Sequence, residues 1–193
     1  NKKLKDGLGK LQSDYCLVNL ADQIKITKIK GNKDRVKFQG QFVKNINISN
    51  NSILDTLKIL RREKVISNYY SVLVKKRIPV FGGLGGGTSN AAFLCKHLLR
   101  NKINEDLLNI LYKRIGSDIK LFFNNQGFLK NLKKLRNFKK KYKLNFLLVY
   151  PNIKCSTKSI YSNVKFYTPL KDHGLKDFNN KSVQSKDNKT NIS

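Results

Sequence analysis

The stretch Gly-Gly-Leu-Gly-Gly-Gly-Thr-Ser-Asn-Ala-Ala at residues 82–92 decides how this sequence is interpreted. Five of the chain's 12 glycines fall within residues 82–87, directly before the hydroxyl residues Thr88 and Ser89 and the small residues of a predicted helix. Glycine allows positive φ and lets a ligand approach the backbone without meeting a Cβ. The free N–H groups at the start of a helix, together with its dipole, favour an anion. The stretch therefore predicts a phosphate-binding loop, and with it a nucleotide-handling enzyme.

The loop differs from two common phosphate-binding patterns. It lacks the lysine of G-x-x-x-x-G-K-[ST] and is denser in glycine than G-x-G-x-x-G. Glycines also permit tight turns, so a purely structural loop is the alternative, but their density before Thr88 and Ser89 favours phosphate binding. Each hydroxyl can contact a phosphate oxygen or a metal ion. The residues that this pattern predicts to bind the nucleotide are Gly82, Gly83, Leu84, Gly85, Gly86, Gly87, Thr88 and Ser89.

Length and composition limit the class of protein. At 193 residues with 39% hydrophobic residues, the chain is predicted to form one packed domain, or one domain and part of another. It contains no methionine and begins with Asn1, so we expect the sequence to be incomplete at both ends. No apolar run approaches the roughly 20 residues of a membrane span, so no membrane association is predicted.

The net charge of +28 allows two interpretations. A strongly basic chain can bind nucleic acid. The excess is mostly lysine, however, alongside abundant Asn and Ile, which is typical of a genome rich in A and T. No motif that interleaves basic and aromatic residues for base stacking is present. A nucleic-acid partner is therefore not favoured, although a polyanionic substrate would still benefit from the positive field.

Cysteines and histidines do not predict a metal site. Cys16, Cys95 and Cys155 are far apart and odd in number, so they fit neither a disulfide framework nor a site with close ligand pairs. We expect the first two to be buried thiols. Neither His97, in a predicted helix, nor His173 has a sequence neighbour that would make it a base. A reducing, cytoplasmic location and a monomer or homodimer are expected.

Strands and helices alternate along the chain, which predicts a mixed α+β class. Extended structure is expected over residues 17–30, around Val36 and Phe38, over residues 70–78, and as a buried strand over residues 144–150. Helices are expected after a capping box at residues 52–55, from about 89 to 99, over 105–114, and from 156 to 164. Residues 166–193 are predicted to be a poorly packed tail.

Asp118 is the predicted catalytic residue. It follows Gly116-Ser117, between an amphipathic helix and an apolar segment that begins at Ile119, and an acid in apolar surroundings needs a reason to be there. One such reason is a helix N-cap. Another is a general base that accepts the proton of a substrate hydroxyl. Downstream of a phosphate-binding loop, the general base is the favoured role.

These motifs resemble those of the GHMP kinases. Residues 79–92 resemble that family's ATP-binding motif, which implies that Pro79, Val80 and Phe81 also bind the nucleotide. Gly116-Ser117-Asp118 resembles its catalytic aspartate segment. Residues 155–161, Cys-Ser-Thr-Lys-Ser-Ile-Tyr, are similar to its Ser-Thr-Lys stretch after a buried strand. Asp6-Gly7 with Leu11-Gln12 is similar to an early segment of the family. The resemblance extends from about residue 6 to residue 165.

The resemblance implies the two-domain α+β GHMP kinase fold, with a nearly complete N-terminal domain and a truncated C-terminal domain. The expected parts are an ATP-binding domain over residues 1–143, the start of a second domain over 144–165, and the tail over 166–193. It further implies ATP and Mg²⁺, with Asp118 as the catalytic residue. The triple glycine before Thr-Ser-Asn is most similar to the branch that phosphorylates the 2-hydroxyl of a cytidine-diphosphate-linked methylerythritol for isoprenoid synthesis. Kinases of homoserine, mevalonate or a sugar, which more often carry Gly-Leu-Gly-Ser-Ser-Ala, are the alternatives within the family.

Departures from the family pattern predict weak activity or none for the chain as it stands. The family's catalytic lysine lies on a strand that would precede residue 1, and its third glycine-rich motif would follow the last residue. Leu8-Gly9 occupies the place of a Tyr-His pair that contacts the cytidine. Residues 131–134, Asn-Leu-Lys-Lys, occupy the place of a Gly-x-Gly-Glu segment. A second class of function therefore remains open: a non-catalytic basic protein that keeps the fold and binds nucleic acid.

Overall fold

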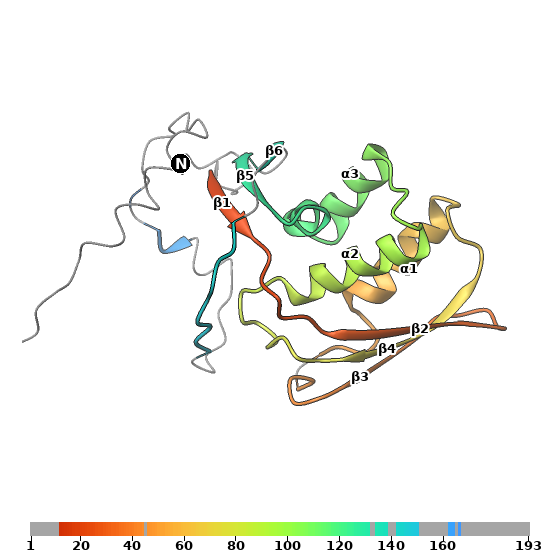
Figure 1. Ribbon diagram of the computed structural model, residues 1–193. Helices are drawn as coiled ribbons and strands as arrows, with labels where there is room; N and C mark the ends of the chain where they lie inside the picture. Colours follow the sequence, from red (N-terminus) through yellow and green to blue (C-terminus); the bar gives the residue numbers. More distant parts are fainter. Residues whose placement is uncertain are drawn as a thin grey trace, which may run out of the picture. The chain divides into compact units, whose positions relative to one another are not determined.

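A three-stranded sheet with two helices on one face carries the site (Figure 1). The computed structural model describes residues 12–44, 46–131, 134–138, 142–150, 162–164 and 166. The strands are β2 (Gln23–Ile29), β4 (Tyr69–Lys75) and β3 (Arg35–Gln39), in that spatial order. β2 runs antiparallel to β4 and β3 runs parallel to it, so β3 and β4 end at the same edge of the sheet.

Alternation along β4 determines which face of the sheet is buried. Val72 lies between Ile26 and Val36 of the neighbouring strands, and Val74 occupies the same face two residues further on. Both valines are at most 1% exposed, which places an apolar row under the helices. The strand predicted over residues 70–78 is thus confirmed, although it ends three residues earlier.

The first helix, α1 (Ser52–Arg62), begins at the residue that was predicted to cap it, so its N-cap lies one residue earlier. Its N-cap is Asn51, whose side chain accepts a hydrogen bond from the N–H of Leu54 at 3.1 Å. The capping box predicted at Ser52 is therefore wrong. Asn caps a helix as well as Ser does, and the hydroxyl of Ser52 bonds elsewhere.

The second helix, α2 (Gly86–Leu98), begins inside the glycine-rich stretch rather than near Ser89. Its N-cap is Gly85, which adopts the left-handed conformation with φ of 64°. The third helix, α3 (Glu105–Arg114), matches its predicted range, and the side chain of Asn104 caps it by accepting from Leu107 N at 2.9 Å.

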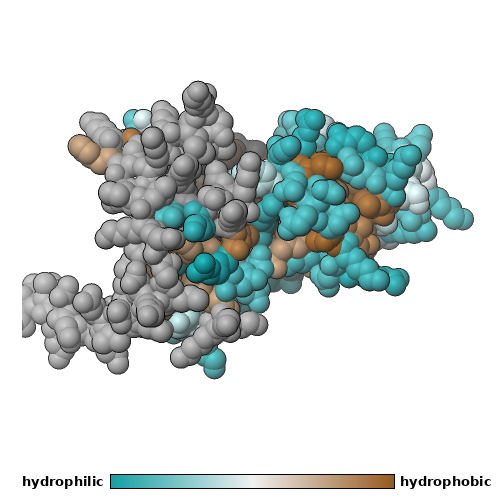
Figure 2. Space-filling model, turned by 90° about the horizontal axis from the view of Figure 1, so that it is seen from above, coloured by the Kyte–Doolittle hydropathy of each residue, from teal (hydrophilic) through white to brown (hydrophobic). Residues whose placement is uncertain are grey.

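Two apolar clusters meet at α2. The first joins α1, β4 and α2 and contains Ile53, Leu57, Val72, Val74 and Leu94. The second joins α1, α2, α3 and a following 3₁₀ helix and contains Ile59, Leu60, Ala91, Ala92, Cys95, Leu107, Leu111 and Ile119. Figure 2 shows apolar side chains between hydrophilic ones on the face of the described residues seen from above. Because α2 contributes to both clusters, the helix that begins in the glycine-rich stretch is fixed from two sides.

A second three-stranded sheet was not predicted. Its strands are β1 (Ser13–Cys16), β5 (Gln126–Asn131) and β6 (Lys134–Asn137), paired antiparallel in the order β1-β5-β6. The extended stretch predicted over residues 17–30 is therefore broken: residues 17–22 connect the two sheets, and only residues 23–29 form the following strand.

The buried strand predicted over residues 144–150 is wrong. These residues form no strand, and the side chains of Leu147 and Val149 are 90% and 80% exposed. A strand buried on both faces needs neighbouring strands, and no described strand pairs with this segment. Its end is held instead by an edge contact between the rings of Tyr150 and Phe42, whose centroids are 6.0 Å apart.

Several predictions fall outside the described residues. They concern the helix predicted from 156, of which only residues 162–164 are described, the tail beyond 166, and the motifs at residues 6–11 and 155–161. The domain boundaries remain predictions.

The packing of α2 predicts a large stability difference between two adjacent side chains. Leu94 is fully buried, whereas its neighbour Phe93 is 45% exposed. We expect Leu94→Ala to lower the free energy of unfolding by about 2–5 kcal/mol because it leaves a cavity. Phe93→Ala should lower it by less than about 1 kcal/mol. Urea unfolding followed by circular dichroism measures both, and equal losses would contradict the assigned packing of α2.

Candidate functional site

The glycine-rich loop connects β4 to α2, and its backbone requires glycine at two places in particular. Gly85 has φ of 64°, and a Cβ there would lie 3.0 Å from Cζ of Phe122. A Cβ on Gly86 would lie 3.0 Å from Cγ2 of Ile78. Larger residues at either place would push the loop away from the elements on which it rests.

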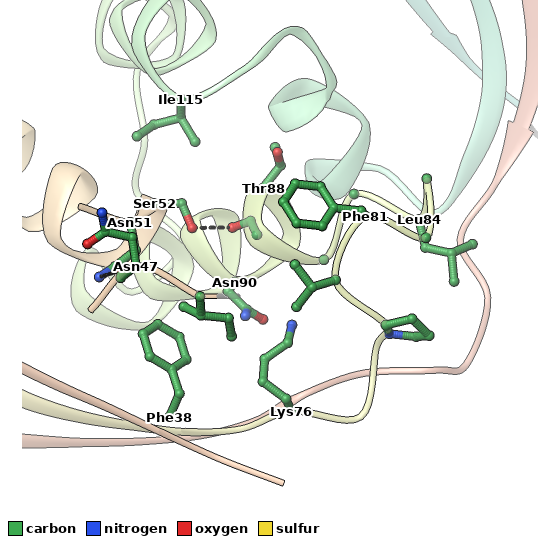
Figure 3. Close-up of a pocket in the computed structure, with 18 of the residues that line it drawn as sticks. Phe38, Asn47, Asn51, Ser52, Lys76, Phe81, Leu84, Thr88, Asn90 and Ile115 are labelled. Atoms are coloured by element: carbon green, nitrogen blue, oxygen red, sulfur yellow. Dashed lines mark hydrogen bonds between the residues drawn. The ribbon is translucent and has the colours of Figure 1, made fainter. Parts of the chain in front are cut away.

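The start of α2 presents free backbone donors to the loop. The N–H of Ser89 bonds to the carbonyl of Gly85 at 2.8 Å, so the N–H groups of residues 86–88 precede the helical hydrogen-bond ladder. The first turn of α2 contains no acidic residue. The Oγ of Ser52 in α1 donates a hydrogen bond to the carbonyl of Gly87 at 2.8 Å (Figure 3). The positive end of the helix is therefore available to an anion, and α1 holds it from behind.

A cavity of about 390 Å³ lies against one side of the loop. Ten of the eleven predicted nucleotide-binding residues, Pro79 to Thr88, line it. The opposite wall comes from the segment between β3 and α1. Figure 3 shows Asn47 and Asn51 of this segment around the same space as Phe38, Lys76 and Asn90. Sequence reasoning thus found the loop side of this cavity but not the wall that faces it.

A second cavity of about 450 Å³ lies on the other side of the loop. Ser89, the remaining predicted residue, lines this cavity together with Asp118 and Lys96. Gly83, Leu84 and Gly85 line both cavities. The loop is therefore a shared wall between the two spaces, and the predicted catalytic residue faces the second one.

Asp118 does not cap a helix. It lies in the first turn of the 3₁₀ helix η1 (Ser117–Phe123), whose N-cap is Gly116. Its side chain is exposed, and Oδ1 accepts a hydrogen bond from Oγ of Ser117 at 3.2 Å. A Cβ on Gly116 would lie 3.5 Å from Oγ1 of Thr88, so this turn packs against the start of α2. The general-base role of Asp118 stays a prediction, but the N-cap alternative is removed.

A buried charge cluster that the sequence did not reveal lies behind the loop. Asp22 has a side chain that is 0% exposed and pairs with Lys76, whose side chain is 5% exposed. Its oxygens also accept from the N–H groups of Arg77 and Ile78 and from the amide of Asn90. Burial alone would raise the pKa of Asp22, but the hydrogen bonds from Lys76, Ile78, Arg77 and Asn90 outweigh it and hold the pKa below the ordinary value.

Other ionisable groups near α2 play smaller parts. The ammonium of Lys96 donates to the carbonyl of Phe122 at 2.6 Å, and burial lowers the pKa of this lysine. Cys95 is fully buried, which confirms the buried thiol predicted there, and burial raises the pKa of this thiol to about 12. Cys16 is only partly buried. His97 stacks on Phe93 at the surface.

The residues of this charge cluster differ in how far the sequence alone indicates their place at the site. Lys76 directly precedes Arg77-Ile78-Pro79, and Asn90 follows Ser89 in the glycine-rich motif, so both adjoin residues that were recognised. Asp22 gives no such signal, because it lies in a connecting segment far from the loop in sequence. Only the fold brings it there.

Comparison with known proteins identifies relatives of the chain. No protein-family model matches it. It is 34% identical over 171 residues to 4-diphosphocytidyl-2-C-methyl-D-erythritol kinase of Pelagibacter ubique, a match that covers 85% of this chain and 60% of that protein. It is 32% identical over 158 residues to the kinase of the same name from Ureaplasma parvum, covering 78% of this chain and 58% of the relative. The chain is a relative of these kinases.

The family resemblance inferred from residues 79–92 is thereby confirmed, and the chain spans about 60% of the length of the Pelagibacter relative. Structural comparison matches 70% of the chain to a crystal structure of 4-(cytidine 5'-diphospho)-2C-methyl-D-erythritol kinase, with a TM-score of 0.49 and 21% identity over 48% of that chain. It matches 60% of the chain to homoserine kinase from Cytophaga hutchinsonii, with a TM-score of 0.46 and 16% identity over 41% of that chain.

The predicted α+β class is the class of the described structure. Within the described part of the chain, no helix is both long and apolar enough to cross a membrane.

The close contacts of Gly86 predict that a side chain there weakens the binding of a nucleotide to the loop. Gly86→Val would displace the first turn of α2, and losing even one charge-assisted hydrogen bond of about 1.5–3 kcal/mol weakens binding about ten- to 100-fold. We expect isothermal titration calorimetry to show this loss for ATP, with the far-UV circular dichroism largely unchanged. Gly31→Ala, in the turn between β2 and β3, is the control: its φ of 155° also strains an added side chain, but the Cβ there meets nothing within 4 Å. Unchanged ATP affinity in Gly86→Val would place the phosphate site elsewhere.

The buried carboxylate of Asp22 predicts a pH-dependent stability difference. Its pKa is lowered in the folded protein, so its contribution is present above the unfolded value of about 3.9 and is lost as the pH falls through the lower folded value. The parent should therefore be more stable than Asp22→Asn at pH 7, and the difference should shrink below about pH 4. Urea unfolding over a pH series measures it. Ile48→Ala, an exposed substitution that removes no titratable group, should show no such trend.

Proposed function

We propose that the protein takes part in phosphoryl transfer from ATP to the 2-hydroxyl of 4-diphosphocytidyl-2-C-methylerythritol, a step of isoprenoid precursor synthesis. The observation that carries the proposal is the shared wall: Gly83, Leu84 and Gly85 separate a cavity suited to a nucleotide from a cavity that contains Asp118. A phosphoryl donor and an acceptor alcohol need two adjoining spaces that meet at the transferred group. The names of the relatives supply the identity of the acceptor.

The cavity beside Pro79 to Thr88 is the proposed site for ATP. Phosphate oxygens would accept from the free N–H groups at the start of α2, where the helix dipole favours negative charge. Phe38, Ile46 and Pro79 line the same cavity and offer apolar surface to the base. The triphosphate would then point towards residues 83–85, which the second cavity also touches.

Asp118 is the proposed general base. Its carboxylate is exposed and lines the second cavity, so it can reach an acceptor molecule bound there. It would accept the proton of the substrate hydroxyl as the oxygen attacks the terminal phosphorus of ATP, while the bond from that phosphorus to the leaving diphosphate oxygen breaks. The backbone donors of α2 would stabilise the charge on the phosphoryl oxygens.

The residues around the loop fit a magnesium ion that arrives with ATP. Mg²⁺ prefers oxygen ligands and is usually held by one or two carboxylates together with substrate phosphates. The hydroxyls of Thr88 and Ser89 and the carboxylate of Asp118 would be available as oxygen ligands on the two sides of the loop. Among the described residues, no three His, Cys, Asp or Glu side chains gather at one place. The ion would neutralise phosphate charge. The cytoplasmic location and the oligomeric state remain predictions.

Substitution of Asp118 tests the catalytic assignment. Asp118→Asn keeps the size of the side chain but removes its negative charge. With purified protein, labelled ATP and 4-diphosphocytidyl-2-C-methylerythritol, we expect turnover to fall by about 10²–10⁴-fold, with the affinity for ATP nearly unchanged. Asp106→Asn, which changes an exposed aspartate in the first turn of α3, should retain the turnover of the parent.

The three outcomes of this assay are clearly separated. Labelled product that depends on Asp118 supports the proposal, even at the low rate that the departures at Leu8-Gly9 predict; those two residues lie outside the described part of the chain. Product formed equally by Asp118→Asn would reject the general base. No product from the parent at all would contradict the kinase activity of this chain.

A further inference from the structure

We propose that Asp22 is a positioning residue that ties the two ends of the glycine-rich loop together and so sets the shape of the phosphate site. The proposal rests on the proposed ATP site and adds to it a residue that lies in neither its loop nor its catalytic turn. Asp22 is located in the segment between β1 and β2 and lines neither of the two cavities described above.

The hydrogen bonds of Asp22 reach both ends of the loop. Its Oδ1 accepts from the backbone N–H groups of Arg77 and Ile78, at 2.7 and 2.9 Å, where the chain leaves β4 and enters the loop. Its Oδ2 accepts from Nδ2 of Asn90 at 2.8 Å, where the chain has left the loop and entered α2. One carboxylate therefore spans residues 79–89 from entrance to exit.

Such a connection matters because the loop has few other internal constraints. Its glycines allow many backbone conformations, and a phosphate site is effective only when its donors already point to the place where charge will lie. Closing the loop at its base removes conformational freedom before the ligand arrives. Ser52, which bonds to the carbonyl of Gly87, restrains the same turn from α1.

Lys76 makes this arrangement compatible with an anion. A carboxylate behind a phosphate site would repel the ligand if it were unpaired. The ammonium of Lys76 pairs with Oδ2 of Asp22 and lies 3.4 Å from the position of a Cβ on Gly86. The pair is therefore neutral as a unit, and Figure 3 shows the side chain of Lys76 extending towards Asn90 of α2.

Asp34 provides a matched control from elsewhere in the fold. Its side chain is 6% exposed, it pairs with Arg61 at 3.0 Å, and it accepts from the N–H of Tyr70 at 2.9 Å. It is thus another buried carboxylate with a cation and a backbone N–H as partners. It lies near the start of β4, whereas the glycine-rich loop follows the end of that strand.

The experiment compares Asp22→Ala with Asp34→Ala. Urea unfolding first establishes that both variants are folded and records how far each is destabilised. Isothermal titration with ATP and Mg²⁺ should then show a dissociation constant raised by at least about tenfold for Asp22→Ala and by less than about twofold for Asp34→Ala. If Asp22 had only a structural role, both variants would be less stable than the parent, but their dissociation constants for ATP would be equal.

Hydrogen exchange in the free protein provides a test that requires no ligand. The N–H of Ser89, bonded to Gly85 O, should exchange at least about tenfold faster in Asp22→Ala than in the parent, and at the parental rate in Asp34→Ala. If the parent fails to bind ATP, the proposed function fails, whereas this exchange difference still tests the positioning role. An unchanged rate at Ser89 in Asp22→Ala would overturn it, as would equal acceleration in Asp34→Ala.

A milder variant preserves the test if Asp22→Ala does not fold. Asn90→Leu removes the connection at the loop exit but leaves the pair of Asp22 with Lys76 and the backbone bonds intact. The expected result is faster exchange at Ser89, with Arg77 and Ile78 protected as in the parent. Slow exchange at Ser89 in Asn90→Leu would show that Asp22 does not act on the exit, and the proposal would be wrong.

Discussion

The carboxylate of Asp22 is fully buried, and a buried charge is tolerated only where it is paired and hydrogen-bonded. Its partners are not drawn from one element. The ammonium comes from Lys76 after β4, two N–H groups come from the next two residues, and an amide comes from Asn90 in α2. Satisfying one charge therefore fixes where β4 ends, where the glycine-rich loop begins and how α2 is placed. Removal of either charge would leave the other buried without an opposite charge, which is more costly than the absence of both.

The position of the loop follows from the strand directions. β3 and β4 run parallel, so the segments after them emerge at the same edge of the sheet, where the N–H of Lys76 bonds to the carbonyl of Gln39 at 2.7 Å. Ligands of open α/β sheets bind outside the carboxyl ends of strands because loops and helix starts gather there. Here the segment after β3 supplies Asn47 and Asn51, and the segment after β4 supplies the glycines. The helix that follows is held in two apolar clusters, so its N–H groups face the cavity from a rigid support.

What could be predicted from the sequence was local in origin. The loop was recognisable because its glycines are contiguous, and α3 because its apolar residues recur at helical spacing beside a capping residue. The strand predicted over residues 144–150 was wrong because strand pairing is not a local property. An uninterrupted apolar run indicates burial but carries no information on which strand will pair with it. β5 and β6 contain Gly127, Lys130 and Lys134 among their apolar residues, so alternation is weak there, and their pairing with β1 is a long-range contact. Asp22 shows the same limit at the site, since its partners lie 54 to 68 residues away in sequence.

The three aspartates with the clearest roles differ mainly in their surroundings. Asp22 and Asp34 are buried, and each has a cation together with backbone N–H donors, so their lone pairs are committed to holding elements together. Asp118 is exposed, bonds to the neighbouring Ser117 hydroxyl, and faces the cavity beyond the loop. A carboxylate with strong fixed partners cannot exchange them for a substrate hydroxyl without leaving a buried cation unpaired. A carboxylate at the wall of a cavity can, because water is the partner it gives up. Of these three, only Asp118 could therefore meet the substrate of the proposed reaction, whereas Asp22 would influence that reaction only through the backbone that it holds.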